Sequence, residues 1–329
     1  MKTVAFFNNK GGVGKTSLTY HLAYMFARLG YTTVAVDLDP QANLTAAFFD
    51  EEKLEEFWED SSQSVYGCVD PMVQGTGDIN FPKPLQVAER LSVVAGDLAL
   101  SQFEDRLSLA WPGCMTQNPA DLRATSAFHR IIRRASKKAQ ASLALVDVGP
   151  NLGAMNRAAL LAADNVVVPL AADLFSLQGL RNLGPTLRRW RREWKKVLEE
   201  AQVGFPLPKG RMRPAGYVIL RHAVRLDRPA KQFARWADQI PEVYRSSVLG
   251  QTEDDGVDHC LARIRNYNSL MPMSQAARKP MFDLKSADGA LGSHARLVAT
   301  CYDDFKALAE AIAKRCNLEK QSSEPSVGE

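Results

Sequence analysis

Short runs of apolar residues alternate along the chain with longer segments in which apolar residues recur every three or four positions. The short runs predict buried strands of a parallel sheet, and the longer segments predict helices with one face packed on that sheet. The predicted strands are 3–7, 33–37, 91–95, 143–147, 165–170 and 215–220. The predicted helices are 18–29, 98–110, 126–141, 183–200 and 298–314. The pattern therefore predicts an α/β fold, with a mostly parallel sheet and helices on both faces.

A few segments lack either pattern. Glycine and proline punctuation predicts loops or irregular structure at 67–84, 111–119 and 269–292. Residues 50–84 are acidic, and we expect them to form an elaboration of the domain that includes an exposed helix. The polar residues 319–329 predict a disordered tail. We therefore expect a single domain over residues 1–318.

The first predicted strand is followed by a glycine-rich stretch that leads directly into the first helix. A curled glycine-rich backbone can point successive N–H groups at one anion, and the helix start adds its dipole. Between a strand and a helix, this is the arrangement of a phosphate-binding loop. In such a loop Lys15 would reach the terminal phosphates of a nucleotide, and the Thr16 hydroxyl would bind Mg²⁺. The candidate nucleotide-binding residues are Gly11, Gly12, Val13, Gly14, Lys15, Thr16 and Ser17.

The loop departs from the general phosphate-loop pattern at one position. The pattern has glycine five residues before Gly14, where this chain has Asn9, and a second lysine, Lys10, follows. The loop therefore carries a lysine at each end. The alternative is a tight turn that binds no nucleotide, but the strand before the loop and the amphipathic helix after it favour the phosphate site.

Carboxylates stand at the ends of two other predicted strands. Asp37 and Asp39 follow one strand, and Asp147 ends another. Because open parallel sheets bind ligands at the carboxyl ends of their strands, we expect Asp37 and Asp39 to face the phosphates and Asp147 to hold Mg²⁺ through water. The alternatives are a turn and helix start at Asp39 and Pro40, and a helix cap at Asp147.

Charge is distributed unevenly along the 329 residues, whose net charge is +4. Residues 36–105 contain 15 acids and 3 bases, whereas residues 181–235 contain 15 bases and 4 acids. The basic second half suggests a surface that faces a polyanion. Trp190 and Trp194 fall at helical spacing there and are expected to pack inward. The arginines around them are candidates for DNA binding or for a solvated face: Arg188, Arg189, Arg191 and Arg192.

A second basic group lies on the predicted helix 126–141, away from that helix's apolar face. A solvated face and a binding role both remain open for these residues, which are Arg130, Arg133, Arg134, Lys137 and Lys138.

Cysteine usage and hydropathy argue against several classes of protein. The five cysteines are dispersed without a C-x-x-C pair, which argues against a disulfide framework and against a zinc site. No apolar run is long enough to cross a bilayer, and no secretory signal is apparent in the first ten residues. We therefore expect a cytoplasmic protein.

Together these motifs resemble the ParA family of P-loop ATPases, which carries a deviant Walker A loop and belongs to the same superfamily as MinD. The resemblance covers most of the chain in the family's order. It rests on Lys10-Gly11-Gly12-Val13-Gly14-Lys15-Thr16, on Asp37-Leu38-Asp39-Pro40-Gln41-Ala42-Asn43, and on Asp147 with Pro150, Leu152 and Gly153.

The resemblance implies a P-loop NTPase fold and slow ATP hydrolysis with Mg²⁺. It implies that Lys15 binds phosphates, that Thr16 and Asp147 hold Mg²⁺, and that Asp39 orients the attacking water. Lys10 matches the family's signature lysine, which crosses to the ATP of a second subunit when two subunits sandwich two nucleotides. Such ATP-bound homodimers commonly bind DNA without sequence preference and are reset by a partner protein that stimulates hydrolysis. The implied role is plasmid or chromosome partition, or positioning of another cargo.

Two other functions remain open. One is a nucleotide-gated adaptor that binds ATP and scarcely hydrolyses it. The family usually has two prolines in the loop after Asp147, where this chain has Val148-Gly149-Pro150-Asn151, and Gly149 predicts a more flexible loop. The other is a membrane-associated switch like MinD, which needs an amphipathic helix at the very C-terminus. The last predicted helix instead mixes acidic and basic residues and precedes a polar tail, so we expect no membrane association.

Overall fold

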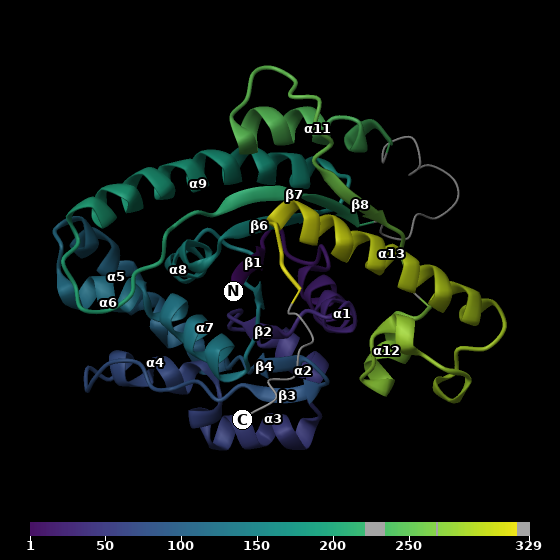
Figure 1. Ribbon diagram of the computed structural model, residues 1–329, viewed down its shortest axis with the longest axis horizontal. Helices are drawn as coiled ribbons and strands as arrows, with labels where there is room; N and C mark the ends of the chain where they lie inside the picture. Colours follow the sequence, from purple (N-terminus) through teal and green to yellow (C-terminus); the bar gives the residue numbers. More distant parts are fainter. Residues whose placement is uncertain (221–233, 268, 321–329) are drawn as a thin grey trace, which may run out of the picture.

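One sheet of eight strands organises the computed structural model, which describes residues 1–220, 234–267 and 269–320. The strand order is β3-β4-β2-β5-β1-β6-β7-β8, and every neighbouring pair except β3 and β4 is parallel. The predicted mostly parallel sheet is therefore confirmed (Figure 1). The strands are β1 (Lys2–Phe6), β2 (Thr33–Asp37), β3 (Leu85–Ala88), β4 (Leu91–Val94), β5 (Leu143–Asp147), β6 (Asn165–Leu170), β7 (Arg213–Leu220) and β8 (Cys260–Ile264).

Helices cover both faces of this sheet (Figure 1). One apolar core lies between the sheet and a layer that includes α7, α8 and α9, and the other lies between the sheet and a layer that includes α1 and α13. The helices are α1 (Lys15–Arg28), α2 (Asn43–Phe48), α3 (Glu51–Glu59), α4 (Val65–Val73), α5 (Phe103–Met115), α6 (Pro119–Thr125), α7 (Ala127–Lys138), α8 (Ala154–Ala162), α9 (Leu174–Glu200), α11 (Ile240–Val243), α12 (Met271–Ala277) and α13 (Ser293–Cys316).

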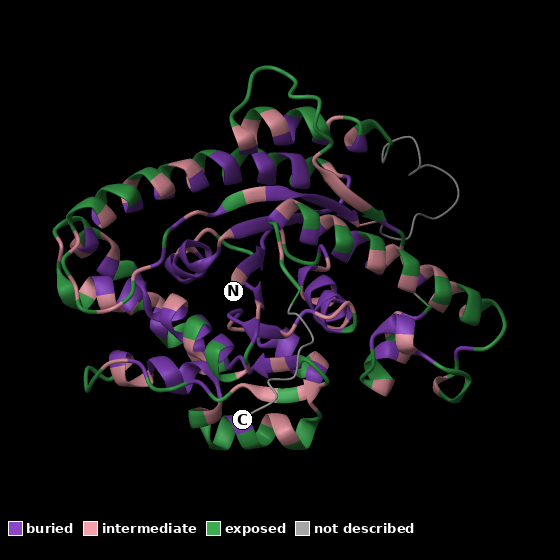
Figure 2. Ribbon diagram, viewed as in Figure 1, coloured by how far each residue is buried: buried purple, intermediate pink, exposed green. Residues whose placement is uncertain are grey.

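Side chains of one strand alternate between the two cores, as the pleat of a strand requires. Val4 and Phe6 of β1 enter the core under α1, whereas Ala5 and the following Phe7 enter the core under α8. All four side chains are fully buried. The central strands are buried along their length, with the exposed residues on the outer faces of the helices (Figure 2). This burial on both faces is why the strands read as continuous apolar runs.

Two predicted loops are partly wrong. The segment predicted as a loop from 67 contains α4, because Ser64 accepts a hydrogen bond from the Gly67 N–H at the helix start and the apolar residues after it are buried at helical spacing. Gly67 is there for space: a Cβ would lie 2.1 Å from the Ser61 carbonyl oxygen. The loop predicted at 111–119 is helical up to Met115, since α5 continues past Pro112 to bury Cys114.

The other predicted segments agree better with the observed structure. The exposed helix expected in the acidic segment is α3, and the segment predicted as irregular at 269–292 contains the short helix α12. Trp190 and Trp194 are buried, so the expectation that they pack inward is confirmed. Residues 321–329 of the predicted tail lie outside the described residues. Among the described helices, none has both the length and the apolar character needed to span a bilayer.

Candidate nucleotide-binding site

The sheet brings the glycine-rich loop and the carboxylates to one edge. Strand β1 lies between β5 and β6, so the loop that follows β1 starts beside the carboxyl ends of both. Phe6 pairs in register with Asp147 of β5, and Asp147 pairs with Asp37 of β2. A hydrogen bond of 2.7 Å from the Asn8 amide to the Pro169 carbonyl ties the loop to the end of β6. The parallel topology thus assembles residues that are far apart in sequence.

The loop backbone has the form expected of an anion cradle. Gly12 has φ 70° and Gly14 has φ 85°, a left-handed conformation that glycine adopts without strain. No described atom lies within 4 Å of a Cβ placed on Gly12, so the loop is open on that side. Gly14 is the N-cap of α1, and within the described structure no side chain caps this helix start. The first N–H groups of α1 are therefore available to an anion.

Lys15 is buried next to this helix start, with 7% of its surface exposed. Burial lowers the pKa of its ammonium group, while the charges of Asp147 and Asp39 act in the opposite direction. The ammonium is thus held in a poorly hydrated position beside two carboxylates. A phosphate group entering the loop would supply the compensating negative charge that water does not.

Thr16 and Asp147 are in direct contact. The Thr16 hydroxyl donates a hydrogen bond of 2.7 Å to Asp147 Oδ2. Asp147 is fully buried, and among the described residues its Oδ1 has no hydrogen-bond partner. Burial, together with repulsion from Asp37, raises the pKa of Asp147 to about 8. An orphaned buried carboxylate oxygen behind a threonine hydroxyl is suited to a nearby divalent cation, which would reverse that effect.

Asp37 does not face the phosphates, contrary to the expectation from sequence. Its carboxylate is fully buried, and its Oδ2 accepts hydrogen bonds from the backbone N–H and the hydroxyl of Thr45 at 2.9 and 2.7 Å. A Cβ on Gly96 would lie 2.8 Å from this carboxyl group. Asp37 therefore fastens the start of α2 to the sheet, and only Asp39 of the two reaches the cavity.

Asp39 lies against the loop that follows β5. Its Oδ1 accepts a hydrogen bond of 3.0 Å from the Gln41 N–H and lies 3.5 Å from the position of a Cβ on Gly149. The Asn156 amide in α8 fastens that loop by donating to the Gly149 carbonyl at 3.0 Å and to the Asn151 carbonyl at 2.7 Å. The flexibility predicted from Gly149 is thus opposed by a side-chain clamp.

Asn156 and Glu104 are positioning residues that sequence reasoning missed. Glu104 of α5 accepts hydrogen bonds of 2.8 Å from the Ala154 and Met155 N–H groups at the start of α8. It therefore caps α8 from 50 residues away and sets the direction in which the loop after β5 leaves the sheet. The polar Asn156 among the alanines and leucines of α8 was the available signal.

Lys10, at the other end of the loop, reaches the start of α9. Its ammonium forms an ion pair with Asp173 at the start of α9 and lies 5.7 Å from the centre of the Phe175 ring. Burial acts to raise the pKa of Asp173, but hydrogen bonds from Lys10 and from the Ser176 N–H outweigh it and lower that pKa. Both partners of the pair are about one third exposed, so Lys10 remains at the surface.

A cavity of about 700 Å³ opens in front of the loop. The volume suits a nucleotide. Besides the loop it is bounded by Tyr20 and His21 of α1 and by residues of α12 that the sequence did not single out. These are Met271, Ser274 and Gln275, together with Arg278, which directly follows α12.

The structure separates the four candidate DNA-binding arginines into two pairs on α9. Arg189 and Arg192 are exposed. Arg188 donates hydrogen bonds of 2.6 and 3.1 Å to the carbonyls of Ser247 and Val248, and burial lowers the pKa of Arg191. Only the first pair presents its charge freely to a partner.

A family model and several curated proteins match this chain by sequence. Residues 1–200 match the family model described as an AAA domain. The sporulation initiation inhibitor protein Soj of Bacillus subtilis is 30% identical over 187 residues, which are 57% of this chain and 65% of Soj. The chain spans about half to two thirds of the length of these and other curated relatives that it matches.

Solved structures resemble nearly the whole chain. Protein DIP2308 of Corynebacterium diphtheriae has a TM-score of 0.68 and 23% identity, covering 96% of this chain and 98% of its own. A putative plasmid partition protein of Borrelia burgdorferi, solved with AMPPNP, has a TM-score of 0.61 and 17% identity, covering 95% and 99%. At these identities the likeness shows a common fold.

Proposed function

The chain belongs to the ParA/MinD family of P-loop ATPases, and from this premise we propose that it is a slow ATP hydrolase whose ATP-bound form is a homodimer that binds DNA without sequence preference. The role that fits this activity is plasmid or chromosome partition, or the positioning of another cargo. A partner protein would stimulate hydrolysis and so release the dimer. The protein would then act in the cytoplasm, on the nucleoid.

The arrangement of the two loop lysines carries the proposal. Lys15 is buried beside the helix start, where it can hold the phosphates of its own subunit's nucleotide. Lys10 is partly exposed and paired with Asp173 of its own subunit, and on leaving this pair it could reach a nucleotide held by a second copy of the chain. Supplying a second positive charge across a dimer interface couples hydrolysis to dimerisation, because the phosphoryl group receives both charges only when both subunits are present.

The other polar residues of the site have separate tasks. Thr16 and Asp147 would hold Mg²⁺, which neutralises phosphate charge when it is bound. Asp39 would orient the water that attacks the terminal phosphate. The Asn156 side chain holds the loop after β5 beside Asp39, so a change at the nucleotide site would be passed to that loop.

DNA binding is assigned to α9. Arg189 and Arg192 are exposed on it, and a dimer doubles the number of such charges presented to one duplex. Contacts of this kind go to the phosphate backbone and are independent of sequence. ATP would then control DNA binding through dimerisation.

The second candidate is a nucleotide-gated adaptor that hydrolyses little ATP. The clamped loop favours it, because the Asn156 side-chain amide shares its two N–H donors among three acceptors in the segment that would have to move during turnover. Steady-state ATPase assays with and without duplex DNA separate the two functions. An ATPase should turn over measurably and respond to DNA, and its Asp39→Ala variant should not. Turnover no higher in the wild type than in Asp39→Ala would favour the adaptor.

A further inference from the structure

A second cavity lies at the opposite end of the sheet from the nucleotide loop, and we propose that it binds a phosphorylated small molecule of about nucleotide size. Its volume is about 720 Å³. Its lining includes Met1, which precedes β1, and Ala141, which precedes β5, so it opens at the amino ends of strands whose carboxyl ends carry the nucleotide site. The two sites share no lining residue.

The basic wall of this cavity comes from one face of α7. Arg130, Arg133, Arg134 and Lys137 are spaced so that they lie on the same side of a helix, and all four line the cavity. The apolar residues of α7 face the core instead. This face holds four of the five basic residues for which the sequence left a solvated surface and a binding role open; the fifth, Lys138, does not line the cavity.

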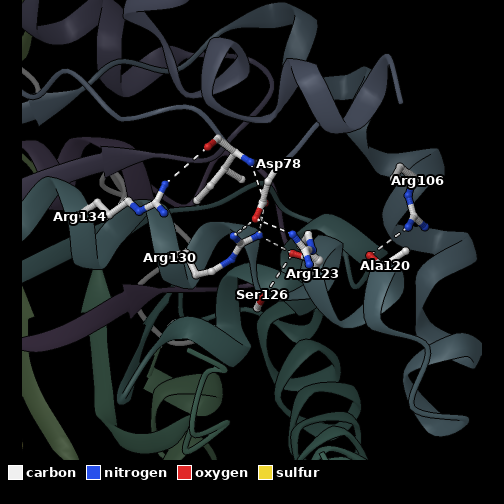
Figure 3. A network of polar contacts seen from close by, with 8 residues as sticks. Asp78, Arg106, Ala120, Arg123, Ser126, Arg130 and Arg134 are labelled. Atoms are coloured by element: carbon white, nitrogen blue, oxygen red, sulfur yellow. Dashed lines mark hydrogen bonds and ion pairs between the residues drawn. The ribbon is translucent and has the colours of Figure 1, made fainter. Parts of the chain in front are cut away.

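Arg130, the deepest of these side chains, is fixed in place. It is 3% exposed, and its guanidinium makes two contacts of 2.8 Å with the two carboxylate oxygens of Asp78 and a third of 2.8 Å with the Arg123 carbonyl (Figure 3). It also lies 5.3 Å from the centre of the Phe205 ring, another lining residue. The cavity wall is therefore preorganised, which lowers the cost of binding a ligand.

Arg134 joins the same wall to the acidic segment that precedes β3. Its guanidinium donates a hydrogen bond of 3.5 Å to the Ile79 carbonyl and lies 4.6 Å from the centre of the Phe81 ring. Figure 3 shows Arg130, Arg134 and Asp78 converging from the two elements. The acidic segment, which had no assigned role, thus supplies one side of the cavity through Asp78 and holds α7 in position.

The charge left over after these contacts is positive. Asp78 is the acid in the lining, and Arg130 and Arg123 pair with it. Arg133 and Lys137 are exposed at the rim, and in the part of the chain that the structure describes no ion pair involves either of them. Within the described structure the cavity thus has two unpaired cations at its rim, Arg133 and Lys137, and the fixed guanidinium groups of Arg130 and Arg134 below them. This arrangement favours an anion with several oxygens, such as a phosphate group.

The shape of the site favours a small ligand over a duplex. A DNA backbone would contact the exposed Arg133 and Lys137, but it could not fill a cavity that extends to the nearly buried Arg130. The volume is within the range of sites for nucleotides and similar cofactors. We therefore assign the cavity to a phosphorylated metabolite rather than to nucleic acid.

The test uses the full chain with the nucleotide loop disabled by Lys15→Ala and ADP as the probe, without Mg²⁺, in equilibrium dialysis. One ADP should bind per chain, and Arg133→Glu with Lys137→Glu should weaken binding at least tenfold. The matched control is Arg296→Glu with Lys314→Glu on α13, which changes the net charge equally at exposed positions outside the cavity. The control should bind ADP as well as the parent does. Thermal melting checks that both variants are folded.

Competition with inorganic phosphate identifies what is recognised. Displacement of ADP by phosphate at comparable concentration assigns recognition to the phosphate group alone, and displacement only by nucleotides adds the nucleoside. Either result supports the site. No ADP binding by the Lys15→Ala chain would overturn the proposal, as would equal loss of binding in the control variant. Loss of duplex DNA binding without any ADP binding would also overturn it, in favour of a nucleic-acid surface.

Discussion

Lys10 forms an ion pair with Asp173, the residue that caps the start of α9. The same lysine is the one that we propose reaches the nucleotide of a second subunit. In the proposed dimer Lys10 cannot make both contacts at once, so dimerisation would break this pair in each subunit. The pair would then restrain dimerisation weakly, because both of its side chains are about one third exposed.

Asp173→Asn should release that restraint. Asparagine keeps the helix cap that Asp173 provides to the Ser176 N–H but removes the charge that holds Lys10. A partly exposed ion pair contributes up to about 1 kcal/mol and the proposed dimer breaks two of them, so ATP-dependent dimerisation should tighten by up to about thirtyfold. Sedimentation across a concentration series measures it. Asp303→Asn, an exposed carboxylate on α13, is the control. Weaker dimerisation in Asp173→Asn would show that the pair supports the dimer instead.

In a chain whose second cavity is disabled by Arg133→Glu with Lys137→Glu, Lys15→Ala should abolish ATP binding. Removing a buried cation that faces a phosphate should weaken affinity by at least about a hundredfold. Calorimetric titration measures the affinity, and Lys10→Ala serves as the matched control because it should leave binding by a single subunit intact. Retained affinity in Lys15→Ala would refute the assignment of the loop.

Asp39→Ala should bind ATP and dimerise yet fail to hydrolyse it. The carboxylate lines the cavity and lies beside the loop after β5, so we expect turnover to fall by about a hundredfold or more. Phosphate release measures turnover, with Asp303→Ala as the control for loss of one carboxylate. Unchanged turnover would remove Asp39 from the mechanism.

Arg189→Glu with Arg192→Glu should weaken DNA binding and make it less sensitive to salt. Each phosphate contact that is lost should lower the salt slope by about 1. Anisotropy titrations over a range of salt concentrations measure the slope. The control is Arg296→Glu with Lys314→Glu on α13, which changes the net charge by the same amount at a different place. Arg188 is omitted because it supports the backbone at Ser247 and Val248. A salt slope equal to that of the wild type would mean that α9 has a solvated face only.

Acid should destabilise the protein through His21. This side chain is 1% exposed, and burial lowers its pKa to about 4, while a hydrogen bond to the Ser17 carbonyl acts the other way. Below about pH 6.5 the unfolded chain takes up a proton at His21 that the folded protein does not bind until about pH 4. The folded protein therefore keeps its full stability above about pH 6.5 and loses stability as the pH falls from there to about 4. The loss should be about 3 kcal/mol, and His21→Phe should remove it from the pH profile of the unfolding free energy. His294→Phe is the matched control at a less buried site. Parallel profiles for wild type and His21→Phe would contradict this account.

How far the sequence could predict the fold depended on burial. Strands β2, β5 and β6 were predicted with their observed bounds, because both faces of each are covered and the apolar run is continuous. The edge strands β3 and β8 were missed, because they are only partly buried and their apolar signal is weak. Helix α4 was missed because Gly67 reads as a break, although it serves a close approach to Ser61.

The sequence also predicted some residues of the candidate site and missed others. The residues of the glycine-rich loop are consecutive, so a short sequence motif was enough to identify them. Asp37 was misplaced, because a carboxylate at a strand end can turn toward the sheet or toward the ligand, and the partner that decided it, Thr45, carries no motif. The pairing of Lys10 with Asp173 and the capping of α8 by Glu104 depend on tertiary packing over long separations. Sequence patterns do not record such contacts.

The most direct test of the central claim is the mass of the Asp39→Ala chain in solution with saturating ATP and Mg²⁺, by sedimentation equilibrium. The account predicts a species of twice the 36.3 kDa chain mass, which reverts to the monomer when Lys10→Ala is added. A monomer of Asp39→Ala at saturating ATP, or a dimer that forms equally well without ATP or without Lys10, would contradict it.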